Sequence, residues 1–224
     1  MEHTETKRCV IVGGAGIGDY PRVRSYLRED DFVIYCDSGL KHAEQLDREP
    51  SLIIGDFDSY DNPHSDIETI VLPVEKDDTD TVFAIREGRR RGYTDFLLVG
   101  VFGARMDHTL VNVYTLFDLD AKGCTALAID DYSEFSVISA KSGAGDGSSG
   151  CVPGYASVEE RYPYFSLLNM TGTARGVTIR GAKFPLEDGE ITSEYQYATS
   201  NEVLAGETAE ITIKEGRLLL IKDI

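Results

Sequence analysis

Two aspartates separated by one residue follow a short apolar segment. Residues 55–59 read GDFDS, which places Asp56 and Asp58 directly after the apolar run Leu52–Ile54. If that run is a strand of an open α/β sheet, both carboxylates can point into the crevice beyond the strand ends, where ligands bind. Hard oxygen ligands suit Mg²⁺. An Asp-rich turn capped by Ser59 explains the motif about equally well.

A second acidic cluster opens a predicted helix at residues 76–80, which read KDDTD. Helix capping explains these acids without any function, since a carboxylate in the first turn stabilises a helix by roughly 0.3–1 kcal/mol. However, grouped acids in a chain of net charge −17 favour a shared cation. We therefore expect Asp80 to join Asp56 and Asp58 around a divalent metal ion, with Lys76 as a point charge for phosphate.

A third segment, residues 103–108, reads GARMDH and lies between a predicted strand and a predicted helix. Arg105 can bind phosphate through two hydrogen bonds, and Asp107 can act on a substrate hydroxyl or simply cap the helix. A lone Asp and His108 at a helix start are ordinarily a cap and a surface ring. The segment is a candidate phosphate site on the strength of Arg105.

Asp37, followed by Ser38 and Gly39, repeats the same placement of an aspartate after an apolar strand. Several strand ends are thus predicted to meet at one acidic crevice that suits Mg²⁺. The glycine-rich residues 13–18, GGAGIG, do not have the G-x-G-x-x-G spacing of a dinucleotide fingerprint. We interpret them as a flexible turn between strand and helix that can also approach a phosphate.

Secondary-structure elements must bring these residues together. Apolar, β-branched runs alternate with helix-like stretches through the first half, which predicts βαβ units and a mostly parallel, Rossmann-like sheet. The predicted strands are Cys9–Val12, Phe32–Cys36, Leu52–Ile54, Thr69–Leu72, Phe96–Val101 and Thr125–Ile129, and the predicted helices are Thr79–Arg91 and His108–Ala121. The apolar residues expected to face the sheet are Val82, Phe83, Ile85, Leu110, Val113, Tyr114 and Phe117.

A Gly/Ser-rich stretch predicts a linker or loop at residues 141–154, and the pattern of apolar residues changes after it. Short alternating strands follow, at Tyr164–Met170, Gly176–Arg180, Glu210–Lys214 and Leu218–Ile221. We expect an α/β domain at residues 1–140 and a small all-β sandwich or barrel at residues 155–224.

Charge and hydropathy exclude several classes of partner. With 39 acidic and 22 basic side chains, the chain repels nucleic acid and anionic lipid and attracts a cationic substrate. No apolar run reaches the roughly 18 residues of a membrane span, and residues 1–8 are polar. We expect a cytoplasmic protein without a membrane or nucleic-acid partner. Its four cysteines lack the spacing of a zinc site or a disulfide framework.

Taken in order, these segments resemble the thiamine pyrophosphokinase family over nearly the whole chain. The matching motifs are DSG at 37–39, GDFDS at 55–59, KDDTD at 76–80, GARMDH at 103–108, GVTIRGAKFPL at 176–186, TSNE at 199–202 and EGRLLLI at 215–221. Ser38 and Ala104 stand where the family usually has glycine. These two changes alter backbone approach to phosphate without removing a proposed ligand.

The resemblance implies transfer of a pyrophosphoryl group from ATP to thiamine, giving thiamine diphosphate and AMP, with Mg²⁺ and in a homodimer. It places nucleotide and metal on the N-terminal domain, and dimerisation and thiamine on the C-terminal domain, so that each active site lies between subunits. The expected site residues are Asp56, Asp58 and Asp80 for metal and catalysis, Asp107 for catalysis, Asp37, Ser38, Gly39, Lys76, Arg105 and His108 for ATP, and Ser200 and Asn201 for thiamine.

Two alternatives stay open. The acidic cluster specifies Mg²⁺ and phosphate better than it specifies the acceptor, so a metal-dependent phosphotransferase or phosphohydrolase on another substrate would carry the same residues. A non-catalytic nucleotide- or thiamine-binding dimer would keep the fold without turnover. The intact set of acids and Arg105 argues against this second alternative.

Overall fold

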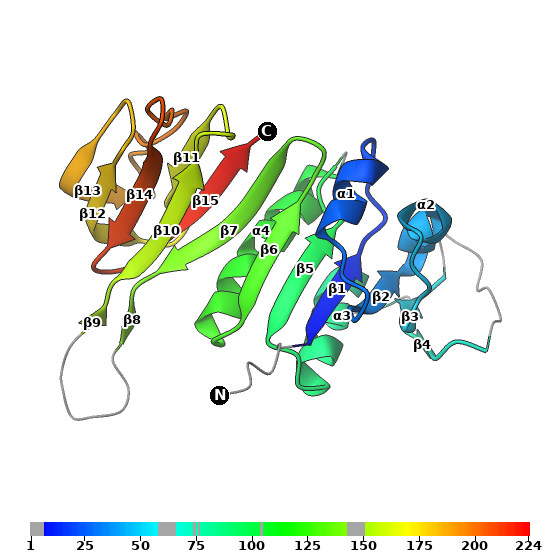
Figure 1. Ribbon diagram of the computed structural model, residues 1–224. Helices are drawn as coiled ribbons and strands as arrows, with labels where there is room; N and C mark the ends of the chain where they lie inside the picture. The colour runs from blue at the N-terminus through cyan, green and yellow to red at the C-terminus, as the bar shows by residue number, and fades with distance from the viewer. Residues whose placement is uncertain (1–6, 58–65, 74, 76, 104, 143–150) are drawn as a thin grey trace, which may run out of the picture. The chain divides into compact units, whose positions relative to one another are not determined.

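The protein consists of two compact units, one ending at Asp131 and the other running from Tyr132 to Ile224. The computed structural model (Figure 1) describes residues 7–57, 66–73, 75, 77–103, 105–142 and 151–224. The first unit is α/β and the second is all-β, as the sequence predicts. The division precedes the predicted boundary at residue 140, because the strand β7 (Ser133–Ser139) belongs to the second unit.

A parallel sheet forms the centre of the first unit. Its strands are β1 (Arg8–Val12), β2 (Phe32–Cys36), β3 (Leu52–Gly55), β4 (Thr69–Val71), β5 (Asp95–Val99) and β6 (Thr125–Ile129). Their order is β6-β5-β1-β2-β3-β4, with every neighbouring pair parallel. The chain winds outward from β1 in both directions, so β1 marks the switch point where ligands bind in such sheets.

Helices cover both faces of this sheet (Figure 1). They are α1 (Tyr20–Tyr26), the 3₁₀ helix η1 (Asp37–His42), α2 (Ala43–Leu46), α3 (Asp80–Arg90) and α4 (Met106–Ala121). Val10 and Val12 pack with Val23 of α1 and Leu46 of α2. On the other face, Gly88 of α3 approaches Cys9 closely.

The sequence pattern found α3 and α4 but misjudged one face of α4. Val113 and Phe117 are buried as expected, whereas Leu110 and Tyr114 are 46% and 49% exposed. Apolar residues occur all round this helix, so periodicity does not select a unique buried face. The short α1, η1 and α2 were not predicted, because a helix of one or two turns carries little periodic signal.

Antiparallel strands make up the second unit. They are β7, β8 (Lys141–Ser142), β9 (Cys151–Val152), β10 (Gly154–Glu159), β11 (Phe165–Leu168), β12 (Thr173–Arg180), β13 (Leu186–Thr192), β14 (Thr208–Ile213) and β15 (Arg217–Asp223). One layer pairs β11-β15-β7 and the other has the order β10-β14-β12-β13. Side chains of both layers share one apolar core, which makes the unit a sandwich.

The Gly/Ser-rich segment interrupts this second unit. Strands β8 and β9 pair with each other on either side of residues 143–150, which lie outside the described residues. The sequence did not predict β7, β10 or β13, since polar residues interrupt the apolar run in each, and β13 also contains an interior glycine.

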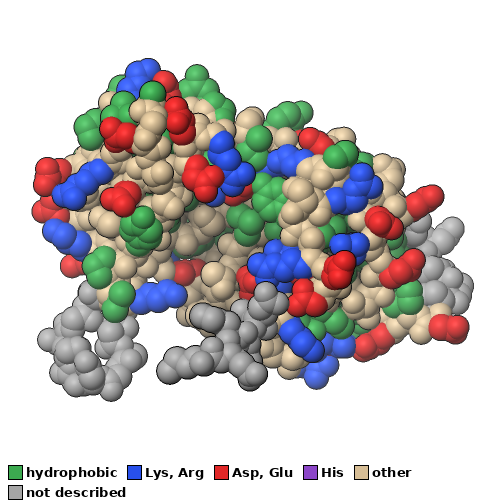
Figure 2. Space-filling model, in the orientation of Figure 1, with side chains coloured by type: hydrophobic (Ala, Val, Ile, Leu, Met, Phe, Trp, Pro, Cys, Tyr) green, Lys and Arg blue, Asp and Glu red, His purple; other side chains and the backbone are tan. Residues whose placement is uncertain are grey.

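Acidic and basic side chains are interspersed over the face shown in Figure 2. Within the part of the chain that the structure describes, no helix combines the length and apolar character needed to cross a membrane.

Candidate active site

A cavity of about 590 Å³ lies at the carboxyl ends of the parallel strands in the first unit. Its walls come from the segments that follow β1, β2, β3 and β5 and from the first turns of α3 and α4. The lining residues are Gly14–Gly16, Cys36–Ser38, Asp56, Asp78–Thr81, Gly100, Val101, Gly103, Arg105, His108 and Asn112. The predicted convergence of strand ends on one acidic crevice is therefore confirmed for Asp37, Asp56 and Asp80.

Each of these three aspartates is placed by the end of an element. Asp37 is buried at the start of η1, directly after β2, with a positive φ of 39°. Asp56 follows the last residue of β3 and is half-buried, and Asp80 is the first residue of α3. Three carboxylates facing one cavity create a negative potential that favours a cation.

The chemistry of these donors suits a magnesium ion, because Mg²⁺ prefers carboxylate oxygens and keeps several water ligands. Among the described residues, no three His, Cys, Asp or Glu side chains come together closely enough to form a ready metal cluster. The predicted ligand Asp58 and the predicted phosphate contact Lys76 both lie outside the described residues. The proposed set of Asp56, Asp58 and Asp80 stays a prediction.

The start of α3 is fixed by a cap and an ion pair. The Thr79 hydroxyl accepts a hydrogen bond from the Val82 N–H at 3.3 Å, so Thr79 is the N-cap. Asp78 also lines the cavity and pairs with Arg86 on the same helix. Asp80, the acid of this cluster predicted to meet a metal, is the first residue of α3 and also lines the cavity, and its metal role stays a prediction.

Arg105 and Asp107 form a two-pronged ion pair at the rim. Arg105 Nε lies 3.1 Å from Asp107 Oδ1, and Nη2 lies 2.6 Å from Oδ2. Hydrogen bonding by the Arg105 guanidinium holds the pKa of the Asp107 carboxyl well below its usual range. Both side chains are exposed, at 69% and 65%. Arg105 and His108 line the cavity as predicted.

Two residues of α4, Thr109 and Asn112, hold the segment that carries Arg105. They were not among the predicted site residues. The buried Asn112 amide donates to the Val101 carbonyl at 2.7 Å, and the Gly103 N–H donates to the Thr109 hydroxyl at 3.2 Å. An Asn one turn beyond His108 on the same helix face was the available sequence signal.

Backbone segments approach each other very closely beneath the cavity. A Cβ on Gly13 would lie 2.6 Å from the Gly100 carbonyl oxygen, and one on Gly100, where φ is +61°, would lie 2.7 Å from that of Gly13. A Cβ on Gly39 would collide with the Val12 carbonyl oxygen. Gly39 was predicted to contact ATP; the structure shows it buried against β1, while its neighbour Ser38 lines the cavity.

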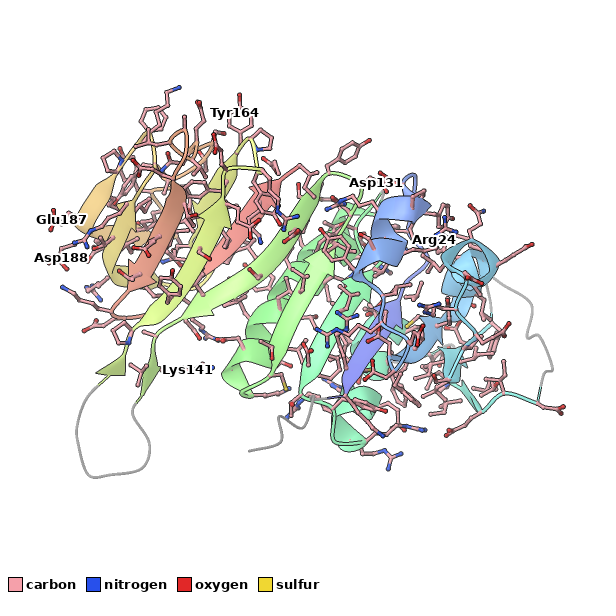
Figure 3. The ribbon with its side chains drawn as sticks, in the orientation of Figure 1. Arg24, Asp131, Lys141, Tyr164, Glu187 and Asp188 are labelled. Carbon is pink, nitrogen blue, oxygen red and sulfur yellow. The ribbon has the colours of Figure 1, made fainter. Side chains whose placement is uncertain are left out.

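The glycine-rich turn at residues 13–18 is held by hydrogen bonds at both of its ends. Gly13 N–H donates to the Val99 carbonyl and Ala15 N–H to the Gly100 carbonyl, each at 2.8 Å. At its far end, the Asp131 carboxylate accepts hydrogen bonds from Gly18 N–H at 2.8 Å and from the following N–H at 2.9 Å (Figure 3). The segment is a turn between the strand β1 and the helix α1, as predicted, and these hydrogen bonds hold both of its ends.

Three described cysteines, Cys9, Cys36 and Cys124, are buried free thiols, as expected of small apolar residues. Cys36 lines the cavity, and burial raises the pKa of its thiol well above the usual value. A neutral thiol is a poor nucleophile and a poor metal ligand, so Cys36 contributes packing.

The predicted thiamine contacts lie in the second unit. Ser200 is exposed with a positive φ of 53°, and its N–H donates to the Ser166 hydroxyl at 3.0 Å. Asn201 is 2% exposed. Its amide donates to the Phe184 carbonyl at 2.8 Å and accepts from the Phe184 N–H at 3.0 Å. Asn201 thus fixes the segment beside it, and a thiamine contact by either residue stays a prediction.

Comparisons with known families match each unit separately. Residues 23–128 match the model of the thiamin pyrophosphokinase catalytic domain, and residues 156–218 match that of the thiamin pyrophosphokinase vitamin B1 binding domain. The thiamine pyrophosphokinase of Bacillus subtilis (strain 168) is 24% identical over 224 residues, covering 96% of this chain and 98% of that protein.

Solved structures show the same fold. The crystal structure of thiamine pyrophosphokinase from Bacillus subtilis has a TM-score of 0.81 at 21% identity, covering 97% of this chain and 99% of that one. The Geobacillus thermodenitrificans protein has a TM-score of 0.78 at 24% identity, with 97% of each chain covered. Yeast thiamin pyrophosphokinase has a TM-score of 0.75 at 12% identity, covering 100% and 88%.

Proposed function

The chain belongs to the thiamine pyrophosphokinase family, and on that premise we propose that it transfers the pyrophosphoryl group of ATP to the hydroxyl of thiamine. The thiamine oxygen bonds to the β-phosphorus, while the bond between that phosphorus and the oxygen bridging it to the α-phosphorus breaks. AMP leaves with the bridging oxygen, and the hydroxyl proton is released.

The observation that carries this proposal is that the vitamin B1 binding model matches the second unit while the catalytic model matches the first. An acidic cavity alone would suit many phosphate-transferring enzymes. The charge of the chain adds support, because thiamine carries a fixed positive charge that a net charge of −17 attracts.

Within the cavity we assign Asp56, Asp58 and Asp80 to Mg²⁺, directly or through its water ligands. When bound, the ion neutralises the phosphate oxygens, which is a main requirement of phosphoryl transfer. Asp37, Ser38, Lys76, Arg105 and His108 are assigned to ATP. Asp107, which pairs with Arg105 in this structure, is assigned to accept a hydrogen bond from the thiamine hydroxyl and orient it.

We further propose a homodimer in which the active site lies between subunits, with the segment around Ser200 and Asn201 contacting thiamine. Light scattering at the protein concentration of the activity assay tests the assembly. A fully active monomer would reject it.

The reaction is tested by incubating the protein with ATP, Mg²⁺ and thiamine, with and without a chelator, and separating the products by chromatography. We expect AMP and thiamine diphosphate in equal amounts, and none after chelation. ADP or free phosphate would indicate a different transfer, and metal-independent turnover would reject the Mg²⁺ assignment.

Substitution of the proposed metal ligands tests the site. We expect Asp56→Asn and Asp58→Asn each to lower kcat/KM by about a hundred-fold or more, because each removes a carboxylate proposed to hold the Mg²⁺ that neutralises the phosphates. Asp30→Asn is the matched control, since this exposed residue precedes β2 at the opposite end of the sheet. Equal activity of Asp58→Asn and Asp30→Asn would show that Asp58 is not a ligand.

A further inference from the structure

His42 is a buried histidine next to the cavity to which the proposed reaction assigns no role. It ends η1 and is 2% exposed. Its Nδ1 lies 2.8 Å from the Tyr20 hydroxyl, and its Nε2 lies 2.8 Å from the Ala15 carbonyl oxygen. A carbonyl only accepts, so Nε2 carries the proton and donates to Ala15, while Nδ1 accepts from Tyr20.

The neutral ring satisfies both contacts, with the Tyr20 hydroxyl as the donor to Nδ1. A protonated Nδ1 would face the Tyr20 hydroxyl with a second N–H, whereas the neutral ring matches a donor on one side and an acceptor on the other. Burial lowers the pKa of His42, which favours the neutral ring.

Lys41, the residue before His42, also binds the glycine-rich turn at residues 13–18. Lys41 Nζ donates to the Gly14 carbonyl oxygen at 2.5 Å, so consecutive residues of η1 hold consecutive carbonyls of the glycine-rich turn. The Ala15 N–H, on the opposite side of the Gly14–Ala15 peptide plane, donates to the Gly100 carbonyl at 2.8 Å. The orientation of these peptide planes is therefore set by η1 on one side and by residue 100 on the other.

The next peptide plane determines where the Gly16 N–H points. In a trans peptide the carbonyl and the following N–H point in opposite directions, so an Ala15 carbonyl aimed at His42 turns the Gly16 N–H away from η1. Gly16 lines the cavity and is exposed, and a Cβ on it would meet nothing within 4 Å. A ligand in the cavity can therefore come close to the backbone of Gly16.

We infer that His42, itself held by Tyr20, is a positioning residue that orients the Gly16 N–H toward a phosphate oxygen of the nucleotide. The inference rests on the proposed function, because it takes the cavity to hold ATP. A cavity lined by Asp37, Asp56 and Asp80 needs donors facing the phosphates, and a backbone N–H supplies one without adding a mobile charged side chain.

The test is the affinity for ATP, measured by titration calorimetry without thiamine, so that no turnover is needed. We expect His42→Leu to weaken ATP binding about ten-fold, and His42→Gln, which can still donate to the Ala15 carbonyl, to recover most of it. Tyr20→Phe should fall between them. Each variant is compared with the wild type by circular dichroism and thermal unfolding.

A double-mutant cycle shows whether His42 acts through Gly16. Gly16→Pro removes the N–H, so adding His42→Leu to it should cause no further loss of ATP affinity. Full additivity would overturn the inference, as would wild-type ATP affinity in a folded His42→Leu. If Gly16→Pro does not fold, failure of His42→Gln to recover affinity overturns it instead. ATP binding without transfer to thiamine would reject the proposed reaction and leave this inference standing.

Discussion

At the residue scale, the ion pair between Arg105 and Asp107 arranges the donors with which the rim of the cavity can bind phosphate. The planar guanidinium makes two hydrogen bonds to one carboxylate, and a phosphate offers two oxygens in a similar arrangement. An incoming nucleotide can therefore take over the donors of Arg105 without moving the backbone.

We expect Arg105→Lys to raise the KM for ATP about ten-fold, because lysine keeps the charge but loses the planar pair of donors. The KM for thiamine should change much less. Steady-state kinetics with each substrate varied in turn measures both, and Arg28→Lys, at the other end of the sheet beside Asp95, is the matched control. An unchanged KM for ATP would show that Arg105 does not bind phosphate through two hydrogen bonds.

The sequence identified many of the cavity-lining acids but not the residues that hold the cavity in shape. Asp37, Asp56 and Asp80 follow strands or open helices, and such positions can be recognised from local pattern. Asn112 and His42 act on backbone groups 11 and 27 residues away in the chain. A contact of that kind depends on the tertiary arrangement, which the types of the neighbouring residues do not reveal.

At the scale of elements, the position of η1 depends on its close approach to β1. A Cβ on Gly39 would meet the carbonyl oxygen of Val12, the last residue of the buried strand β1, and this backbone atom cannot move aside as a flexible side chain would. We expect Gly39→Ala to lower the free energy of unfolding by about 1–3 kcal/mol, the usual cost of overpacking a core.

Denaturant unfolding at fixed pH measures this loss, with Gly16→Ala as the control because a Cβ there meets open space. Equal stability of the two variants would mean that η1 shifts away from β1 at little cost. In that case the ATP affinity of Gly39→Ala should fall, since Asp37 and Ser38 move with η1.

Element boundaries show where local pattern was insufficient. The parallel strands β1, β2, β3 and β6 were predicted within a residue or two, since buried strands of a parallel sheet are continuous apolar runs. The strands β7 and β13 carry polar residues on both faces, and β13 contains a glycine and several acids. The segment β7 is a strand because it pairs with β15, and β13 is a strand because it pairs with β12.

At the scale of the whole molecule, the net charge of −17 acts on both proposed substrates, with opposite sign. Thiamine is a cation and is attracted, whereas ATP is an anion and is repelled until Mg²⁺ and Arg105 compensate it. Salt screens both effects over a Debye length of about 10 Å at 0.1 M.

We therefore expect the KM for thiamine to rise about two- to five-fold between low and physiological ionic strength, while the KM for ATP falls or stays level. Kinetics over a series of chloride concentrations at constant free Mg²⁺ measures both. A KM for thiamine that falls with salt would mean that local cations, rather than the overall charge, dominate its approach.

The order of an α/β unit and an all-β unit could be predicted from the sequence, but the point of division could not. Gly/Ser composition drew the predicted boundary toward residue 141, whereas the structure places β7 in the second unit. Composition shows only that a segment lacks apolar residues. Loops inside a unit and linkers between units share this composition, so it does not locate a boundary.

The backbone contacts beneath the cavity also bear on how this protein can be re-engineered or can diverge. Where Gly13 faces Gly100 and Gly39 faces Val12, main chain meets main chain, and a substitution by any larger residue disturbs the support itself. Mutational routes to a different nucleotide preference are therefore concentrated at positions such as Arg105 and His108, which line the cavity and lie outside these main-chain contacts. A variant library directed at those positions would sample new selectivities while most of its members still fold.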